Sequence, residues 1–153
     1  MPTAPRHAIL LLLLLAVGCR PAARGGEAPR YVPVGGSAPL PFSAAVRVGP
    51  LLYLSGQIGT DSAGHLVPGG IAAETRQALE NIRSVLEHNE SSLDRVVKCT
   101  AMLADIHDWG AMNQVYVTYF RRHLPARSAF ATSGLVFGAR IELECMASVG
   151  AGS

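Results

Sequence analysis

Two charged side chains near the C-terminal end have chemistry that could serve a binding or catalytic site, Arg127 as an anion binder and Glu142 as an acid–base group. Arg127 follows Pro125 and has no acidic residue beside it in the sequence. Its guanidinium is a planar, permanently charged fork, which suits bidentate binding of a carboxylate. Glu142 lies in an alternating apolar segment, where one carboxyl group could accept a proton and later return it. The structural alternative is that each charge only forms an ion pair, for example Glu142 with Arg140.

The other polar residues match no common catalytic or metal-binding pattern. The histidines are scattered and no HExxH or Cys-x-x-Cys spacing occurs, so we expect no metal site. Ser55 lacks the Gly-x-Ser-x-Gly elbow of serine hydrolases. The glycines between 59 and 70 fit no phosphate-binding loop, and no organic cofactor is expected. The cluster Asp105, His107 and Asp108 is interpreted as the turn and cap that open a helix.

The N-terminal segment is typical of an exported protein. Residues 1–18 contain an apolar run over 8–16, which is too short to span a membrane and matches a signal peptide. Ala-Val-Gly-Cys at 16–19 resembles a lipobox, so we expect Cys19 to be lipidated and to anchor the protein to the membrane. Ordinary signal cleavage is the alternative. The predicted location is the cell envelope. The protein is expected to be anchored there by lipid, or else to be periplasmic or secreted.

The rest of the chain divides into a tether and one domain. Residues 19–38 are rich in Pro and Gly and are predicted to be a flexible linker. Residues 39–150 are long enough for one folded domain. The net charge of +2 creates no strong field, and the one basic pair of the domain is Arg121 with Arg122. We therefore expect no nucleic-acid partner.

The domain has the periodicities of an α+β fold in the order ββαβαββ. Strands are predicted at 42–48, 51–57, 96–103, 128–132 and 141–149. The first helix has the apolar stripe Thr75, Ala78, Leu79, Ile82, Val85 and Leu86. The second, capped by Asp108, has the stripe Trp109, Met112, Tyr116, Tyr119 and Phe120. Two helices can cover only one face of the sheet.

The last predicted strand separates two kinds of surface. One of its faces is apolar and consists of Ile141, Leu143, Cys145, Ala147 and Val149. The other carries Glu142, Glu144, Met146 and Ser148, and we expect Ser55 and Gln57 to share it. That face is too polar for a core and too apolar for free solvent, which predicts a homo-oligomer that buries it.

Cys99 and Cys145 both fall in predicted strands among apolar neighbours. Two cysteines in an exported chain could form a disulfide. Buried free thiols are also common in such settings, and the sequence favours free thiols here.

Several ordered motifs resemble the RidA (YjgF/UK114) family across about residues 40–150. They are LYLSGQI at 52–58, GHLVPGGI at 64–71, ETRQALENI at 74–82, MNQVY at 112–116, PARS at 125–128 and RIELE at 140–144. The resemblance implies a chorismate-mutase-like fold, two helices on one face of the sheet, and a homotrimer with three sites in clefts between subunits. It also implies hydrolysis of 2-aminoacrylate and its imine tautomer to a 2-oxo acid and ammonia, without a cofactor.

The resemblance assigns the two charged residues catalytic roles. Arg127 matches the residue that holds the carboxylate of the imine substrate. Glu142 matches the glutamate that orients the attacking water, with Glu144 as the substitute candidate.

Further residues match the substrate-binding positions of the family. Ser55 and Gly56 match the strand end that lines the pocket, and glycine there allows close approach of a ligand. Asn113 matches a helix residue that faces the cleft, and a solvated asparagine on the helix surface is the alternative. The backbone N–H of Ala129 is expected to help hold the carboxylate.

Two residues depart from the family pattern. Phe42 replaces a tyrosine and so loses a hydroxyl group, and Ala129 replaces a common cysteine. These changes concern substrate choice and rate more than fold. They leave an alternative function open, in which the protein is a non-catalytic trimer of the cell envelope that binds a small ligand or another protein. Retention of Arg127 together with Glu142 favours catalysis, because binding of a carboxylate alone would not need the glutamate.

Overall fold

The alternation predicted for the last strand produces the central strand of a mixed sheet. In the computed structural model, which describes residues 27–35 and 40–150, β7 spans Ile141–Ser148 and pairs with β3, β4 and β5. Its apolar positions from Ile141 to Ala147 are buried, and the residues between them are partly or fully exposed. The predicted two-faced strand is therefore confirmed.

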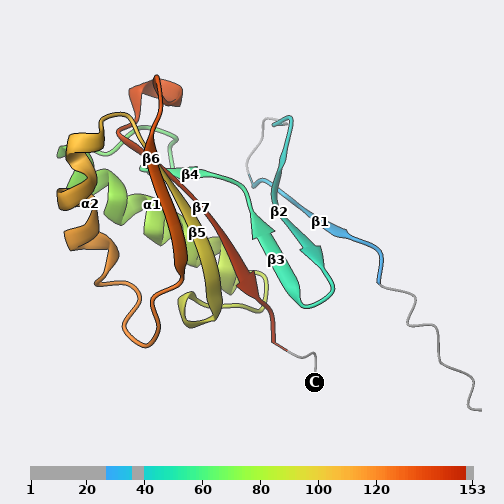
Figure 1. The fold of residues 1–153 in the computed structure, drawn as a ribbon. Coiled ribbons are helices and arrows are strands. Elements are labelled where there is room, and N and C mark those ends of the chain that lie inside the picture. The colour runs from blue at the N-terminus through green and yellow to red at the C-terminus, as the bar shows by residue number, and fades with distance from the viewer. Residues whose placement is uncertain (1–26, 36–39, 151–153) are drawn as a thin grey trace, which may run out of the picture.

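The strand order in the sheet is β1-β2-β3-β7-β5-β6, with the short β4 also paired to β7 (Figure 1). The other strands are β1 (Arg30–Pro33), β2 (Ser43–Val48), β3 (Leu51–Leu54), β4 (Gln57–Ile58), β5 (Val96–Leu103) and β6 (Ala126–Ala131). The helices are α1 (Gly70–Glu87) and α2 (Trp109–Tyr116), with 3₁₀ turns η1 (Leu93–Arg95), η2 (Ile106–Asp108) and η3 (Val136–Gly138). Among the paired strands of the described residues, β5 and β6 alone run parallel, because α2 lies in the connection between them.

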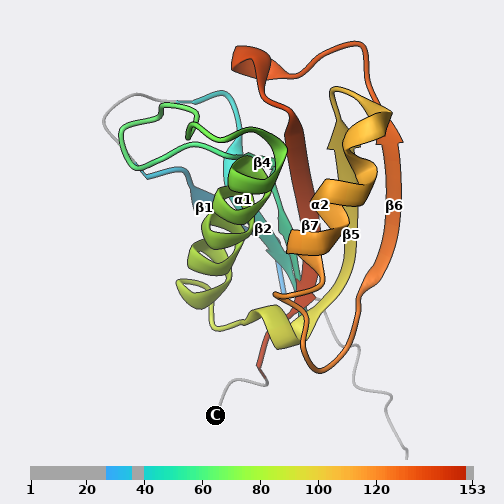
Figure 2. The same cartoon turned by 90° about the vertical axis from the view of Figure 1, so that its left-hand side faces the viewer.

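Both helices pack on the same face of the sheet, as predicted (Figure 2). The stripe of α1 from Thr75 to Leu86 is largely buried against the apolar side of β7. The face opposite the helices, called the open face below, has no covering element among the described residues. No helix in the described part of the chain is long and apolar enough to cross a membrane.

The strand predicted over 51–57 is interrupted by a bulge. Tyr53 pairs with Met146, whereas Gln57 pairs with Leu143, so the β3–β4 segment has one residue more than β7 over this stretch. Gln57 consequently shares the helix-covered side with Leu143. The expectation that it lies on the same face as Glu142 is wrong.

Part of the predicted linker is a strand. Residues 30–33 form β1, which pairs with β2 at the edge of the sheet, and Val32 packs against the core. The linker prediction is therefore wrong for these residues, because the edge of β2 presents unpaired backbone groups with which an extended segment can pair. The predicted signal peptide over 1–18 and Cys19 lie outside the described residues.

The second helix begins as predicted, but its capping differs. Asp105 accepts a hydrogen bond from the backbone N–H of His107 at 2.9 Å and so caps the η2 turn. Asp108 makes no side-chain cap. Its carboxylate accepts from the guanidinium of Arg140 at the start of β7 instead. Trp109, expected in the apolar stripe, is 47% exposed.

The prediction of free thiols is wrong. Cys99 on β5 and Cys145 on β7 are directly opposite one another in the sheet and form a disulfide. Both are buried, at 1% and 2% exposure. The sequence could not reveal this pairing, because it depends on the register between two strands that are 46 residues apart.

Candidate active site

Arg127 lies on β6 against the rings and the thioether of α2. The guanidinium carbon is 4.6 Å from the ring centroid of Tyr116 and 6.0 Å from that of Trp109. Nη1 is 3.7 Å from Sδ of Met112. Within the described residues Arg127 forms no ion pair. The alternative in which Arg127 only serves an internal salt bridge is therefore not supported.

Asn113 and Arg127 share one hollow, as expected for two residues of a single site. The hollow has a volume of about 170 Å³ and its remaining wall is formed by Tyr116, Val117, Leu124 and Pro125. Asn113 lies three residues before Tyr116 on α2, so the same side of the helix contacts Arg127 and lines the hollow. A cation, an amide and an apolar wall together suit a small carboxylic acid.

The two rings and the thioether around Arg127 were not identified from the sequence as parts of a site. Tyr116 and Met112 were predicted only as core residues. Their spacing with Trp109, at positions 109, 112 and 116, is one stripe of a helix. Burial raises the pKa of Tyr116 to about 12, and the charge of Arg127 opposes this shift. Tyr116 therefore contacts Arg127 as a neutral phenol.

Glu142 lies on β7 at the bulge between β3 and β4. It pairs with Ile58 on β4 and with Met102 on β5, and it is half-buried. A Cβ atom at Gly56 would overlap Oε1 of Glu142. Gly56 thus provides the space in which the Glu142 carboxylate lies, which brings these two predicted site residues together.

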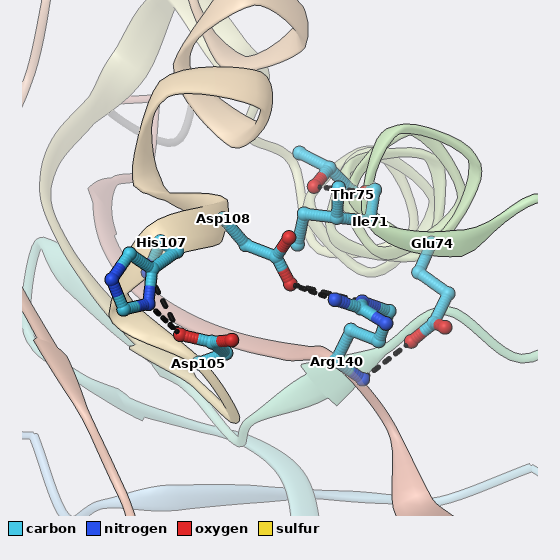
Figure 3. Close-up of polar contacts among 7 residues, drawn as sticks. All are labelled: Ile71, Glu74, Thr75, Asp105, His107, Asp108 and Arg140. Atoms are coloured by element: carbon cyan, nitrogen blue, oxygen red, sulfur yellow. Dashed lines mark hydrogen bonds and ion pairs between the residues drawn. The ribbon is translucent and has the colours of Figure 1, made fainter.

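Arg140 does not pair with Glu142, although the sequence left that possibility open. Figure 3 shows its guanidinium directed at Asp108, with Nε and Nη2 donating to Oδ2 at 2.9 and 2.7 Å. Its backbone N–H donates to the buried carboxylate of Glu74 on α1 at 2.7 Å. The ion pair with Asp108 raises the pKa of Arg140. These contacts anchor the start of β7 and leave the Glu142 carboxylate free of Arg140.

Arg127 and Glu142 belong to separate halves of the candidate site. Arg127 pairs with Cys99, whose side chain is buried under the helices, so Arg127 lies on the helix-covered face. Glu142 pairs with Met102 and lies on the open face. The first half comprises Arg127 and Asn113, and Ala129 follows Arg127 on the same side of β6. The second half comprises Glu142 and Gly56.

A family model described as endoribonuclease L-PSP matches residues 36–149. RidA from the Antarctic bacterium Psychrobacter is 32% identical with a TM-score of 0.69, over 78% of this chain and 94% of that chain. This chain belongs to the RidA family. A solved structure of the yeast protein YEO7 is 41% identical with a TM-score of 0.71, over 78% of this chain and 94% of that one. A rat relative named 2-iminobutanoate/2-iminopropanoate deaminase is 48% identical over 110 residues, which are 71% of this chain and 80% of the relative.

The remaining expected site residues of this RidA chain are Ser55, Phe42 and the substitute candidate Glu144. The Ser55 hydroxyl donates to the Ser43 carbonyl at 2.6 Å, so its proton is already used to tie the end of β3 to β2. Phe42 precedes β2 and is 53% exposed. Glu144 shares the open face with Glu142 but lines a different hollow, of about 190 Å³, beside Tyr53, Lys98 and Thr100.

Proposed function

We propose that this protein hydrolyses reactive enamines and imines of the 2-aminoacrylate and 2-iminopropanoate type to 2-oxo acids and ammonia. Deaminase relatives at 45–48% identity support this reaction class. The observation that carries the proposal is the Arg127 guanidinium, which has no ionic partner among the described residues and shares a hollow with Asn113. An unpaired, partly buried cation is costly unless a ligand anion completes it, and these substrates carry a carboxylate.

In the proposed reaction, Arg127 binds the carboxylate and holds the imine carbon near a water molecule. An enamine first tautomerises to the imine. Glu142 accepts a proton from the water as its oxygen bonds to the imine carbon, and then returns the proton to nitrogen. The remaining hydroxyl proton of the resulting carbinolamine then passes through Glu142 to nitrogen, and cleavage of the carbon–nitrogen bond releases ammonia and leaves a 2-oxo acid. One water is consumed, and no metal, redox partner or organic cofactor is needed.

The proposal requires Arg127 of one subunit and Glu142 of the partner subunit to meet, in a homotrimer with three such clefts. Two features support assembly. The two residues lie on opposite sides of one sheet, so a single chain cannot direct both at one small ligand. The open face also carries exposed apolar side chains, including Val48, Tyr53 and Phe130 at 43%, 40% and 47% exposure. A second and third copy would remove this surface from water.

We also propose export and lipid anchoring through Cys19, with the catalytic domain in the cell envelope. The disulfide between Cys99 and Cys145 supports an oxidising compartment, since such bonds are rare in the cytosol of most organisms. Metabolic labelling with a fatty acid tests the anchor. Incorporation of label that Cys19→Ala abolishes is expected, and equal labelling of both proteins would contradict the proposal.

The catalytic proposal is tested by competition for a freshly formed imine. An amino-acid oxidase generates the imine, and semicarbazide traps whatever the full chain, purified in mild detergent, does not hydrolyse. Wild type should suppress semicarbazone formation, and Arg127→Ala and Glu142→Gln should lose that ability. Arg122→Ala and Glu87→Gln, which change exposed residues of the same types, are the matched controls.

Wild type that behaves like the protein-free sample with several imines, while still folded and oligomeric, would overturn the catalytic proposal. The non-catalytic ligand-binding trimer would then take its place. Loss of activity in the matched controls would show that the assay responds to surface charge and not to the site.

A further inference from the structure

The guanidinium of Arg127 is supported by aromatic and sulfur groups where most buried or half-buried arginines have a carboxylate. Tyr116 provides the nearest ring at 4.6 Å, with Trp109 at 6.0 Å and Met112 Sδ at 3.7 Å from Nη1. All three come from one stripe of α2. None of them carries a negative charge, so they fix the position of the guanidinium without neutralising it.

Tyr116 acts through its ring, because its hydroxyl has no function that the described residues reveal. The residue is 3% exposed, and its buried hydroxyl oxygen has no hydrogen-bond partner among them. A buried unsatisfied hydroxyl is unfavourable, so the favourable contacts that the described residues show for Tyr116 are those of its ring. Those contacts are with Arg127 on one side and with Phe120, whose ring centroid is 4.7 Å away, on the other.

Arg83 provides an internal comparison. Its guanidinium also lies over a tyrosine, Tyr119, at 5.2 Å. Arg83 in addition pairs with Glu80 at 2.6 Å, and the Tyr119 hydroxyl donates to the same carboxylate group at 2.7 Å. The Arg83 cluster is therefore neutral overall, whereas the Arg127 cluster retains a full positive charge next to a hollow.

We propose that Tyr116, assisted by Trp109, is a positioning residue for substrate binding: its ring holds the Arg127 guanidinium in the orientation that receives the substrate carboxylate and leaves the charge available. This inference rests on the proposed function. A preorganised fork loses less side-chain entropy when it binds, so the ring increases affinity without touching the reacting atoms.

The test measures binding of 2-oxobutanoate, a stable 2-oxo acid, to the full chain by calorimetry in mild detergent. Tyr116→Leu removes the ring and should weaken binding about tenfold, which corresponds to about 1.4 kcal/mol and lies within the range for a partly desolvated cation–π contact. Tyr116→Phe keeps the ring and should restore wild-type affinity. Trp109→Leu changes an exposed residue and should weaken binding about two- to threefold. Tyr119→Leu, which removes the comparison ring, should leave the affinity unchanged.

A second readout reports the orientation of Arg127 without any ligand. The ring current of Tyr116 should shift the NMR signals of the Arg127 guanidinium. This shift should persist in Tyr116→Phe and fall in Tyr116→Leu to the smaller shift caused by the more distant Trp109 ring. If Tyr116→Leu fails to fold, two measurements still test the inference. They are the affinity of Trp109→Leu for 2-oxobutanoate and the comparison of the Arg127 NMR signals between wild type and Tyr116→Phe.

Equal affinity and equal Arg127 signals in wild type and Tyr116→Leu would overturn the inference. Loss of affinity in Tyr116→Phe would also overturn it, because the hydroxyl would then be the active group. If wild type binds no 2-oxo acid but shows the ring-current shift, the proposed function is contradicted. The contact by which Tyr116 positions the Arg127 guanidinium would then still hold.

Discussion

The side chains of Arg127 and Glu142 lie on opposite faces of one sheet. Their pairing partners on β5 are Cys99 and Met102, which are an odd number of residues apart, and successive side chains of a strand alternate between faces. Cys99 is buried under the helices, whereas Met102 lies on the open face. A small ligand that touches both Arg127 and Glu142 must therefore contact two copies of the chain.

Mixed assemblies test this arrangement. Arg127→Ala and Glu142→Gln should each be inactive alone, whereas co-expression should restore imine hydrolysis. Some interfaces then combine the intact Arg127 of one variant with the intact Glu142 of the other. With random mixing about a quarter of the interfaces regain both residues, so about a quarter of wild-type activity is expected. No recovery in assemblies shown to contain both variants would contradict a shared site.

Gly56→Ala should disturb catalysis more than binding. The added methyl group would displace the Glu142 carboxylate, which lies on the face of the sheet opposite Arg127 in the same chain. We expect kcat to fall about 10- to 100-fold, as for small misplacements of a catalytic group, with KM nearly unchanged. Steady-state kinetics and the melting temperature measure the effect.

Gly110→Ala is the matched control for Gly56→Ala. A Cβ atom at Gly110, in the first turn of α2, meets no neighbour within 4 Å. It should leave the kinetics unchanged and stabilise the fold by roughly 0.5 kcal/mol, because alanine is a better helix former than glycine. A similar loss of kcat in both variants would argue against a specific displacement of Glu142.

Reduction of the disulfide should destabilise the domain. The bond between Cys99 and Cys145 closes a segment of 46 residues, and removing such a link costs about 2–4 kcal/mol. Denaturant unfolding with and without reductant measures the difference. The variant with alanine at both positions should show no response to reductant. Alkylation of both thiols in the unreduced, denatured protein would show that the bond is absent.

Alkaline pH should weaken the fold through two tyrosines. Burial raises the pKa of Tyr116 to about 12, and burial together with the hydrogen bond to Glu80 raises that of Tyr119 to about 12, from 10.0. A raised pKa means that the folded state prefers the protonated phenol. This contribution is complete below pH 10 and is lost as the pH approaches 12. Unfolding midpoints measured from pH 8 to 11.5 should fall less in a variant with phenylalanine at both positions.

The local features of this protein were predictable from sequence. The two-residue alternation from Ile141 to Val149 and the three- to four-residue spacing from Thr75 to Leu86 follow from the geometry of a strand and a helix. Such periodicities need no knowledge of distant residues. The order of elements from β2 to β7, the two-faced β7 and the coverage of one face by both helices were correct for this reason. The motifs around Arg127 and Glu142 also identified the family and the candidate residues.

Only the tertiary structure decided how these elements meet. The pairing of Cys99 with Cys145, the bulge that moves Gln57 away from Glu142, and the addition of β1 all depend on register between separate segments. The same holds for the ring of Tyr116 beneath Arg127, since helix spacing shows which residues share a stripe but not what that stripe contacts. Register and packing are set by the sum of many contacts distant in sequence, so the local pattern determined the parts of the site and long-range pairing determined their arrangement.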